Sequence, residues 1–210
     1  LINRNIYPLV KKNSHFRIFN EELIDLWKVR KYISTVNNEI KFRINKELKV
    51  RELLLSGLYG RFCKINKPQK NDLNKVDALI QKMFLNNIAN KRFGYLSDGE
   101  KQISLIARAI INNPKVLILD EPSVNIDLKS KIFLINKIKD LSKLGICILC
   151  ITHDISIITK EYNRVIFLKD REIIRDGKPH ELMSSENINQ LFDINIRLIE
   201  NSDSWDVFRE

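Results

Sequence analysis

Two short apolar runs, each followed by side chains that suit a metal or a phosphate, constrain this chain more than any other feature. Residues 116–119 read Val-Leu-Ile-Leu and lead into Asp120 and Glu121, and residues 146–152 read Ile-Cys-Ile-Leu-Cys-Ile-Thr and lead into His153. Short runs that are apolar throughout are typical of strands buried inside a parallel sheet. Because such sheets carry their ligands at the carboxyl ends of the strands, we expect the two acids and the histidine to share one edge, as a site for a metal and a polarised water.

A helix start with phosphate-binding character precedes the first of these strands. Residues 96–100 read Leu-Ser-Asp-Gly-Glu, and a run with helical apolar spacing follows them as far as Asn112. The unsatisfied N–H groups and the dipole at such a start favour phosphate. Pro114 then separates this helix from the strand, and residues 123–127, Ser-Val-Asn-Ile-Asp, follow the strand.

These stretches, taken together, resemble the motifs of the ATP-binding cassette (ABC) ATPases. Residues 96–100 resemble the Leu-Ser-Gly-Gly-Gln signature, residues 117–121 the Walker B strand, residues 123–127 the D-loop, and His153 the switch histidine. Each motif alone is weak, since an Asp-Glu pair after an apolar strand is common, whereas all four in this order and spacing are specific.

The resemblance implies an α/β fold of the P-loop NTPase (RecA-like) type, the ABC nucleotide-binding domain, with an inserted helical subdomain. It implies that residues 1–44 belong to the amino-terminal part of the ATPase core, residues 45–95 to the helical subdomain, and residues 96–210 to the remaining core. Residues 50–57 and 176–192 also resemble importers of metals and metal chelates, such as iron complexes.

The resemblance further implies a MgATP site that two subunits share. Asp120 would hold Mg²⁺ through its water shell, Glu121 would polarise the attacking water, and His153 would contact the γ-phosphate. The signature would bind nucleotide held by the opposite subunit. Its residues are Leu96, Ser97, Asp98, Gly99 and Glu100, and those of the D-loop are Ser123 and Asp127.

Three positions depart from the family's pattern. The Q-loop glutamine falls on Asn38, or on Asn37 after a one-residue slip, and a plain turn asparagine stays an equally open interpretation. Asp98 replaces the first glycine of the signature pair and Glu100 replaces its glutamine. Since phosphate binding has to survive, we expect the Asp98 carboxylate to face solvent.

The family's phosphate cradle has no counterpart in the printed sequence. Nothing in the 210 residues matches G-x-x-x-x-G-K-[ST], and residues 1–4 resemble the middle of a helix. We therefore expect the amino-terminal part of a full domain to be missing, and residues 1–210 alone to be inactive.

The net charge of +10 is concentrated in the first part of the chain. Residues 1–95 hold 20 Lys and Arg against 8 Asp and Glu, whereas residues 96–210 hold 16 against 18. Two explanations stay open: a general bias toward Lys, Asn and Ile, or a surface that faces anionic lipid or another polyanion.

Cysteine and apolar content suggest the compartment. Three cysteines make no disulfide framework, and Cys147 and Cys150, despite their C-x-x-C spacing, are expected to be small buried residues of the strand over 146–152. No apolar run approaches the roughly 20 residues that span a bilayer, so we expect a soluble chain in the cytosol.

The resemblance implies the ATP-hydrolysing subunit of a transporter, which would couple MgATP hydrolysis to movement of a solute through a separate permease. Its partners would be transmembrane permease subunits and a second ATPase subunit, identical or related, at the inner face of the plasma membrane, with no nucleic acid. A chromosome-maintenance or DNA-repair ATPase would carry long heptad coiled coils, and a translation-type protein two cassettes; neither is seen. A non-catalytic regulator is favoured only by Asn38 and the missing loop.

Overall fold

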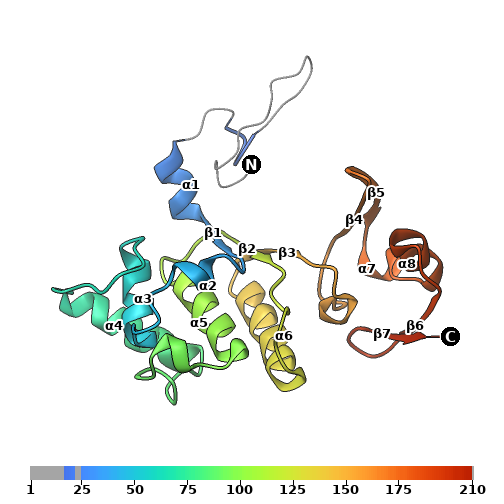
Figure 1. Cartoon of the computed structure of the whole chain (residues 1–210). Coiled ribbons are helices and arrows are strands. Elements are labelled where there is room, and N and C mark those ends of the chain that lie inside the picture. The colour runs from blue at the N-terminus through green and yellow to red at the C-terminus, as the bar shows by residue number, and fades with distance from the viewer. Residues whose placement is uncertain (1–16, 22–24, 210) are drawn as a thin grey trace. The chain divides into compact units, whose positions relative to one another are not determined.

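The computed structural model describes residues 17–21 and 25–209 (Figure 1). The chain divides after Ile151 into two compact units. Within the described residues, no helix combines the length and the apolar character needed to cross a membrane. The predicted helix over residues 1–10 lies outside the described residues.

The first unit is built on a parallel sheet with the strand order β1-β2-β3. Its strands are β1 (Ile33–Val36), β2 (Val116–Asp120) and β3 (Cys147–Ile151). Val36 lies opposite Leu119, and Asp120 lies opposite Ile151. All three strands therefore end at one edge, as the two apolar runs predicted.

Helices α5 and α6 lie side by side along one face of this sheet (Figure 1). The helices of the unit are α1 (Leu26–Tyr32), α2 (Ile40–Arg43), α3 (Val50–Leu58), α4 (Lys70–Lys82), α5 (Asp98–Ile110) and α6 (Leu128–Lys143), with a 3₁₀ turn over Phe93–Tyr95 before α5. The helical spacing of apolar residues predicts helices over 48–62 and 72–84, and these correspond to α3 and α4. The predicted subdomain boundaries, 44/45 and 95/96, fall inside this unit and stay a prediction.

Helix α3 is shorter than expected because a glycine ends it. Gly60 has φ 62°, the left-handed conformation that suits the residue after a helix cap. Its N–H donates to the Gly57 carbonyl at 3.1 Å, and the Arg61 N–H donates to the Ser56 carbonyl at 3.0 Å. These two bonds make a Schellman motif, which satisfies the last carbonyls of the helix.

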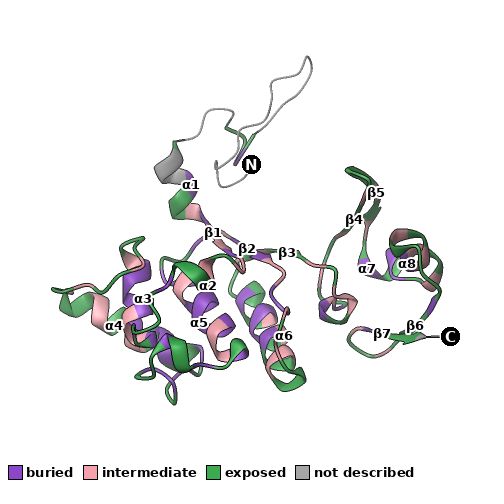
Figure 2. Ribbon diagram, in the orientation of Figure 1, coloured by how far each residue is buried: buried purple, intermediate pink, exposed green. Residues whose placement is uncertain are grey.

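The main core of the first unit joins the sheet to α3, α5 and α6. Leu117 and Leu119 of β2 are fully buried, and so are Leu54, Ile106 and Leu134 from the three helices (Figure 2). Ile118, between the two leucines, points to the other face, where it packs with a smaller cluster of Ile18, Val29 and Ile33. Both faces of β2 are therefore apolar, which explains its continuous apolar sequence.

Strand β3 is not buried as predicted. Cys147, Leu149 and Ile151 are exposed, and only Ile148 and Cys150 pack against the core. The expectation that Cys147 is a buried residue is therefore wrong, and Cys150 is half-buried. The main core covers the face of β3 toward α6, whereas the smaller cluster on the other face of the sheet contains residues of β1 and β2 and, among the described residues, none of β3.

The second unit contains two antiparallel hairpins and two short helices. Residues 165–169 and 172–175 predict a hairpin about Asp170 and Arg171. It is formed by β4 (Val165–Lys169) and β5 (Glu172–Gly177), and the two connecting residues both have positive φ. The other elements are a 3₁₀ turn (Ile155–Ile157), α7 (Pro179–Leu182), α8 (Ser185–Phe192), β6 (Ile196–Glu200) and β7 (Trp205–Arg209).

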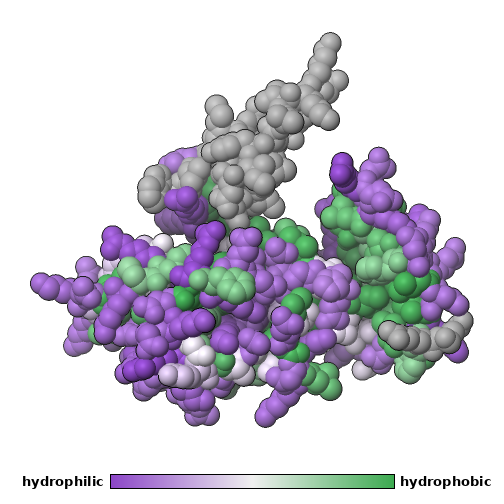
Figure 3. All heavy atoms as spheres, viewed as in Figure 1, coloured by the Kyte–Doolittle hydropathy of each residue, from purple (hydrophilic) through white to green (hydrophobic). Residues whose placement is uncertain are grey.

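The apolar residues over 194–199 predict a last strand, which corresponds to β6, whereas β7 was not predicted. β7 pairs with β6, and its Trp205 is buried in the core of this unit with Phe167 and Ile188. Hydrophobic side chains also gather on the visible surface of this unit (Figure 3), and the β4–β5 hairpin exposes Ile166, Leu168 and Ile173.

Candidate functional site

The acidic pair lies at the carboxyl end of the middle strand. Asp120 is the last residue of β2, and the Glu121 N–H donates to the Ile151 carbonyl at 2.8 Å. Both acids are half-buried. The end of β3 therefore fixes the backbone of both acids, at the edge where open α/β sheets bind ligands.

Glu121 has a backbone conformation that its sequence did not predict. Its φ is 50°, in the left-handed region that side chains other than glycine seldom adopt. The conformation costs on the order of 1–3 kcal/mol and is enriched at functional sites. The strain turns the chain sharply out of the sheet directly after Asp120.

His153 follows β3 by two residues and is exposed in a bend. It belongs to the second unit, which begins at Thr152. Its closeness to Glu121 therefore stays a prediction.

The two asparagines after β1 differ in what their side chains do. Asn37 Oδ1 accepts a hydrogen bond at 3.2 Å from the N–H of Ile40, the first residue of α2. Asn38 lies in the turn before this helix, where its backbone carbonyl accepts from the Lys41 N–H at 3.3 Å, and it is half-buried. The assignment of Asn38 to the Q-loop stays a prediction.

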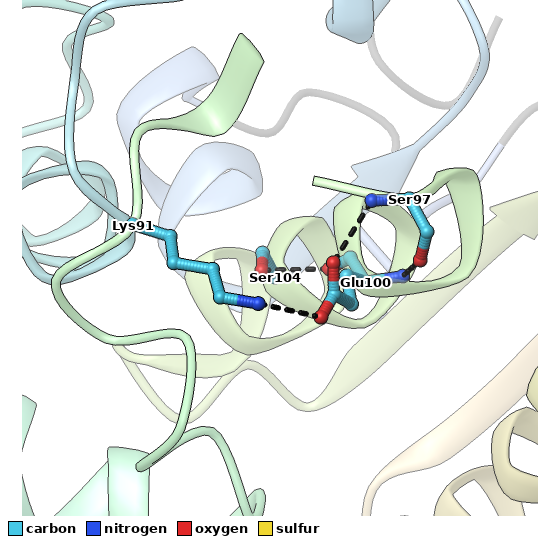
Figure 4. Close-up of polar contacts among 4 residues, drawn as sticks. All are labelled: Lys91, Ser97, Glu100 and Ser104. Atoms are coloured by element: carbon cyan, nitrogen blue, oxygen red, sulfur yellow. Dashed lines mark hydrogen bonds and ion pairs between the residues drawn. The ribbon is translucent and has the colours of Figure 1, made fainter. Parts of the chain in front are cut away.

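A capping box holds the start of α5 (Figure 4). Ser97 Oγ accepts from the Glu100 N–H at 3.2 Å, and the Ser97 N–H donates to Glu100 Oε2 at 2.9 Å. Lys91 Nζ lies 3.5 Å from Glu100 Oε1, and the Ser104 hydroxyl donates to the Glu100 carbonyl at 2.7 Å. Glutamine and glutamate serve equally at this position of a capping box, so the Glu100 replacement keeps the geometry of the helix start.

Asp98 is exposed, as expected, with half of its side chain in solvent. Its carboxylate lies 3.4 Å from Lys101 Nζ. Lys41 is close enough to interact with it: burial lowers the pKa of Lys41, and the Asp98 charge opposes that shift. Two lysines therefore offset the charge that Asp98 brings to the helix start.

The D-loop ends in a second helix cap. Ser123 is buried, and Asp127 is the N-cap of α6. Asp127 Oδ1 accepts from the Ser130 N–H at 3.0 Å, and Oδ2 accepts from the Ser130 hydroxyl at 2.6 Å. These bonds hold the pKa of Asp127 below its usual value, and the bond from the Ser130 hydroxyl has the largest effect. Asn125, inside the loop, also has positive φ.

Sequence reasoning missed three residues near these motifs: Lys41, Lys91 and Ser130. The pairing of Ser97 with Glu100 had a readable signal, the pattern Ser-x-x-Glu before an apolar run. The lysines and Ser130 had none, because their contacts depend on how separate elements pack.

The acidic pair suits a magnesium ion that arrives with a nucleotide. Mg²⁺ is usually held by one or two carboxylates together with waters and substrate phosphates. Asp120 supplies such a carboxylate, and in the part of the chain that the structure describes no three His, Cys, Asp or Glu side chains gather into a metal cage. This donor set fits Mg²⁺ shared with phosphate oxygens.

Comparison with known proteins gives a family. The model of the ABC transporter family matches residues 5–124. The ABC transporter ATP-binding protein YlmA of Bacillus subtilis (strain 168) is 29% identical over 178 residues, which are 84% of this chain and 67% of YlmA. The zinc uptake system ATP-binding protein ZurA of Listeria monocytogenes serovar 1/2a is 30% identical over 179 residues, 82% of this chain and 67% of ZurA. The chain thus spans about two thirds of these relatives.

A solved structure agrees on the fold. That of cbiO1 from Clostridium perfringens, part of the ABC transporter complex cbiONQ, superposes with a TM-score of 0.73 at 24% identity, covering 90% of this chain and 74% of cbiO1. The architecture is that of the ABC ATPase domain, a P-loop NTPase fold. From the matched residues 5–124 and the shared fold, this chain belongs to the ABC transporter family.

Proposed function

We propose that this chain is the ATP-hydrolysing subunit of an ABC importer and couples MgATP hydrolysis to solute movement through a separate permease. One observation carries the proposal: Asp120 and Glu121 stand at the end of the middle strand, and the Glu121 backbone is bound to Ile151 of the neighbouring strand. A carboxylate for the metal and a second carboxylate for the water are the protein groups that this chemistry needs beside the phosphate cradle.

Each candidate site residue has one proposed role. Asp120 would hold Mg²⁺ through its water shell, and the ion would supply positive charge that neutralises the phosphates. Glu121 accepts a hydrogen bond from the attacking water and orients it. His153 donates to the γ-phosphate. Asn38 takes the Q-loop position, where its amide links the site to residues 45–95.

The α5 start acts on nucleotide held by a second subunit. Ser97 and the N–H groups around Gly99 bind the γ-phosphate, aided by the helix dipole. Support comes from the Ser97–Glu100 capping box, which leaves the helix start ordered. The partners are therefore a second ATPase subunit, identical or related, and permease subunits in the plasma membrane, with this chain at the cytoplasmic face.

The solute we propose is a metal ion or a metal chelate such as an iron complex. The zinc uptake role in the name of ZurA supports this class. The test is an ATPase assay of the complete gene product reconstituted with its permease, in the presence of zinc, iron chelates or an amino acid. Stimulation by the amino acid and not by the metals would overturn the metal assignment.

A phosphate cradle has to be supplied for this chemistry. Residues 1–210 contain no Gly-Lys-Ser/Thr motif, and positioning of the phosphates dominates phosphoryl transfer. We expect residues 1–210 alone not to bind MgATP and a strand–loop–helix with Gly-Lys-Ser/Thr placed before Leu1 to restore binding. Isothermal titration of both forms measures this, and micromolar affinity in the shorter one would contradict it.

A non-catalytic regulator is the second candidate, because Asn38 stands where the family has glutamine. A coupled ATPase assay of the complete gene product, with and without permease, separates the two. Nucleotide binding without turnover in both conditions would favour the regulator.

A further inference from the structure

The first turns of α5 and α6 touch at Gly99 and Ser130. A Cβ atom placed on Gly99 would overlap with both the Oγ and the Cβ of Ser130, whereas the Ser130 Cα would lie 3.7 Å away, at ordinary contact distance. Gly99 is buried. The missing side chain at position 99 is therefore what lets the two helix starts approach.

Ser130 is held in place from its other side. Its N–H and its hydroxyl both donate to the Asp127 carboxylate, at 3.0 and 2.6 Å. A change of rotamer at Ser130 would break the hydroxyl's bond and would still leave its Cβ against Gly99. The contact therefore has little freedom to adjust.

The two ends of this contact belong to the two halves of the candidate site. Gly99 is the second residue of the helix that Ser97 caps, and Asp127 ends the loop that starts at Glu121. This loop is itself constrained, because Glu121 and Asn125 have positive φ and Ser123 is buried. A shift of the α5 start is thus passed through close-packed atoms to the loop that carries the glutamate.

We propose that Ser130 is a positioning residue for ATP hydrolysis, which fixes the loop from Glu121 to Asp127 against the start of α5 through its contact with Gly99. The proposal rests on the proposed function, since it assumes that α5 binds phosphate and that Glu121 orients water. Binding of phosphate at α5 would then set the position of Glu121 within the same subunit.

Four variants of the complete gene product test the contact by rescue: Gly99→Ala, two double variants that add a change at Ser130, and the Ser130→Gly single variant as the reference. Gly99→Ala introduces the overlap; adding Ser130→Gly removes both overlapping atoms, and adding Ser130→Ala removes only the hydroxyl. The rate of hydrogen exchange over residues 121–130 should rise about tenfold in Gly99→Ala. In the double variant with Ser130→Gly it should return to the level of the Ser130→Gly single variant, whereas in the double variant with Ser130→Ala it should stay high. Exchange in the β4–β5 hairpin is the internal control and should stay unchanged.

The positioning role is tested by kinetics on the same proteins. A misplacement of about 1 Å costs up to about 100-fold in rate, so Gly99→Ala should lower kcat at least about tenfold. The double variants separate this effect from any direct effect of the new methyl group on phosphate binding at α5. Ser130→Gly should restore kcat in the double variant and Ser130→Ala should not. If Gly99→Ala is insoluble, the yield of soluble protein tests the contact instead: Ser130→Gly should restore it and Ser130→Ala should not.

Three results would overturn the inference. If Ser130→Ala rescues Gly99→Ala as completely as Ser130→Gly does, the steric contact between positions 99 and 130 is not the cause of the defect. If Gly99→Ala alters hydrogen exchange over residues 121–130 but has a normal kcat, Ser130 is not a positioning residue, and the proposed function still stands. A wild-type protein that neither binds nor hydrolyses MgATP overturns the proposed function, and the positioning role with it.

Discussion

The N–H of Glu121 donates a 2.8 Å hydrogen bond to the carbonyl of Ile151, which extends the pairing of β2 and β3 past the last paired residue, Asp120. Glu121 also has φ 50°, so the chain leaves the sheet at this bond. The strained conformation is held by the strand beside it, as such outliers require. The glutamate is therefore positioned by the sheet and not by a flexible loop, and this relationship underlies the predictions below.

Replacement of Asn38 by alanine tests the Q-loop assignment. Asn38→Ala removes the amide that we propose to link the site to residues 45–95, so it should abolish stimulation of ATP hydrolysis by the permease. Basal hydrolysis should stay within about twofold, because the proposed role of this amide is coupling and not the chemical step. Asn37→Ala is the matched control: it removes the 3.2 Å hydrogen bond from the Ile40 N–H and should leave stimulation in place. Equal stimulation in wild type and Asn38→Ala would make Asn38 a plain turn residue.

A bulky cation at Ser97 tests the shared site. Ser97→Arg fills the start of α5, so the subunit should still bind ATP as a monomer but should not dimerise when ATP is added. Gel filtration with and without ATP measures this. Ser142→Arg, at an exposed serine near the end of α6, is the control and should dimerise normally. ATP-dependent dimers of Ser97→Arg at wild-type yield would contradict a site completed by the second subunit.

Acid should weaken the cap of α6. The hydrogen bonds from Ser130 lower the pKa of Asp127 from 3.8. A carboxylate with a depressed pKa stabilises the folded state above its unfolded pKa, and this contribution is lost as the pH falls through the lower, folded value. The difference in unfolding free energy between wild type and Asp127→Ala should therefore be constant above about pH 5. It should shrink toward zero as the pH falls below 3.8.

The control for this pH profile is Ser130→Ala, which keeps Asp127 but removes the hydroxyl that accounts for the largest part of the shift. Its stability should depend less on pH across the same range. A wild-type to Asp127→Ala difference that stays constant down to pH 2 would show that the cap bonds do not favour the carboxylate.

The basic first part of the chain should bind anionic membranes weakly. Residues 1–95 carry 20 Lys and Arg against 8 Asp and Glu, and such attraction is screened over about 8 Å at physiological salt. Sedimentation with acidic liposomes should show binding that falls steeply between low and physiological salt. Tight, saturable binding to duplex DNA at physiological salt would instead favour the chromosome-maintenance class.

Much of the fold could be predicted where a local pattern decides the structure. The apolar run before Asp120 predicted a buried middle strand, and the residues about Asp170 predicted a hairpin, because each pattern lies within a few residues. The exposure of β3 could not be predicted in the same way. It depends on which faces of the sheet other elements cover, and the apolar sequence of residues 147–151 does not contain that information.

The same distinction between local patterns and contacts of separate elements applies to the candidate site. The resemblance named Glu121 and Ser97, and the residues around them predicted a strand end and a helix start, which the structure has. The left-handed conformation of Glu121 and the contact between Gly99 and Ser130 could not be predicted, because both arise where separate elements meet.

The central claim is that Glu121 orients the water that attacks ATP, and one substitution tests it directly. Glu121→Gln keeps the shape of the side chain and the backbone bond to Ile151 but removes the negative charge. Hydrolysis by the complete gene product should fall at least about 100-fold, the usual contribution of a positioned base, with the Kd of ATP within about threefold. Glu172→Gln, at an exposed glutamate of β5, is the control and should hydrolyse ATP at the wild-type rate. Turnover of Glu121→Gln within about threefold of wild type would contradict the account, since a base worth about 100-fold cannot then be this residue.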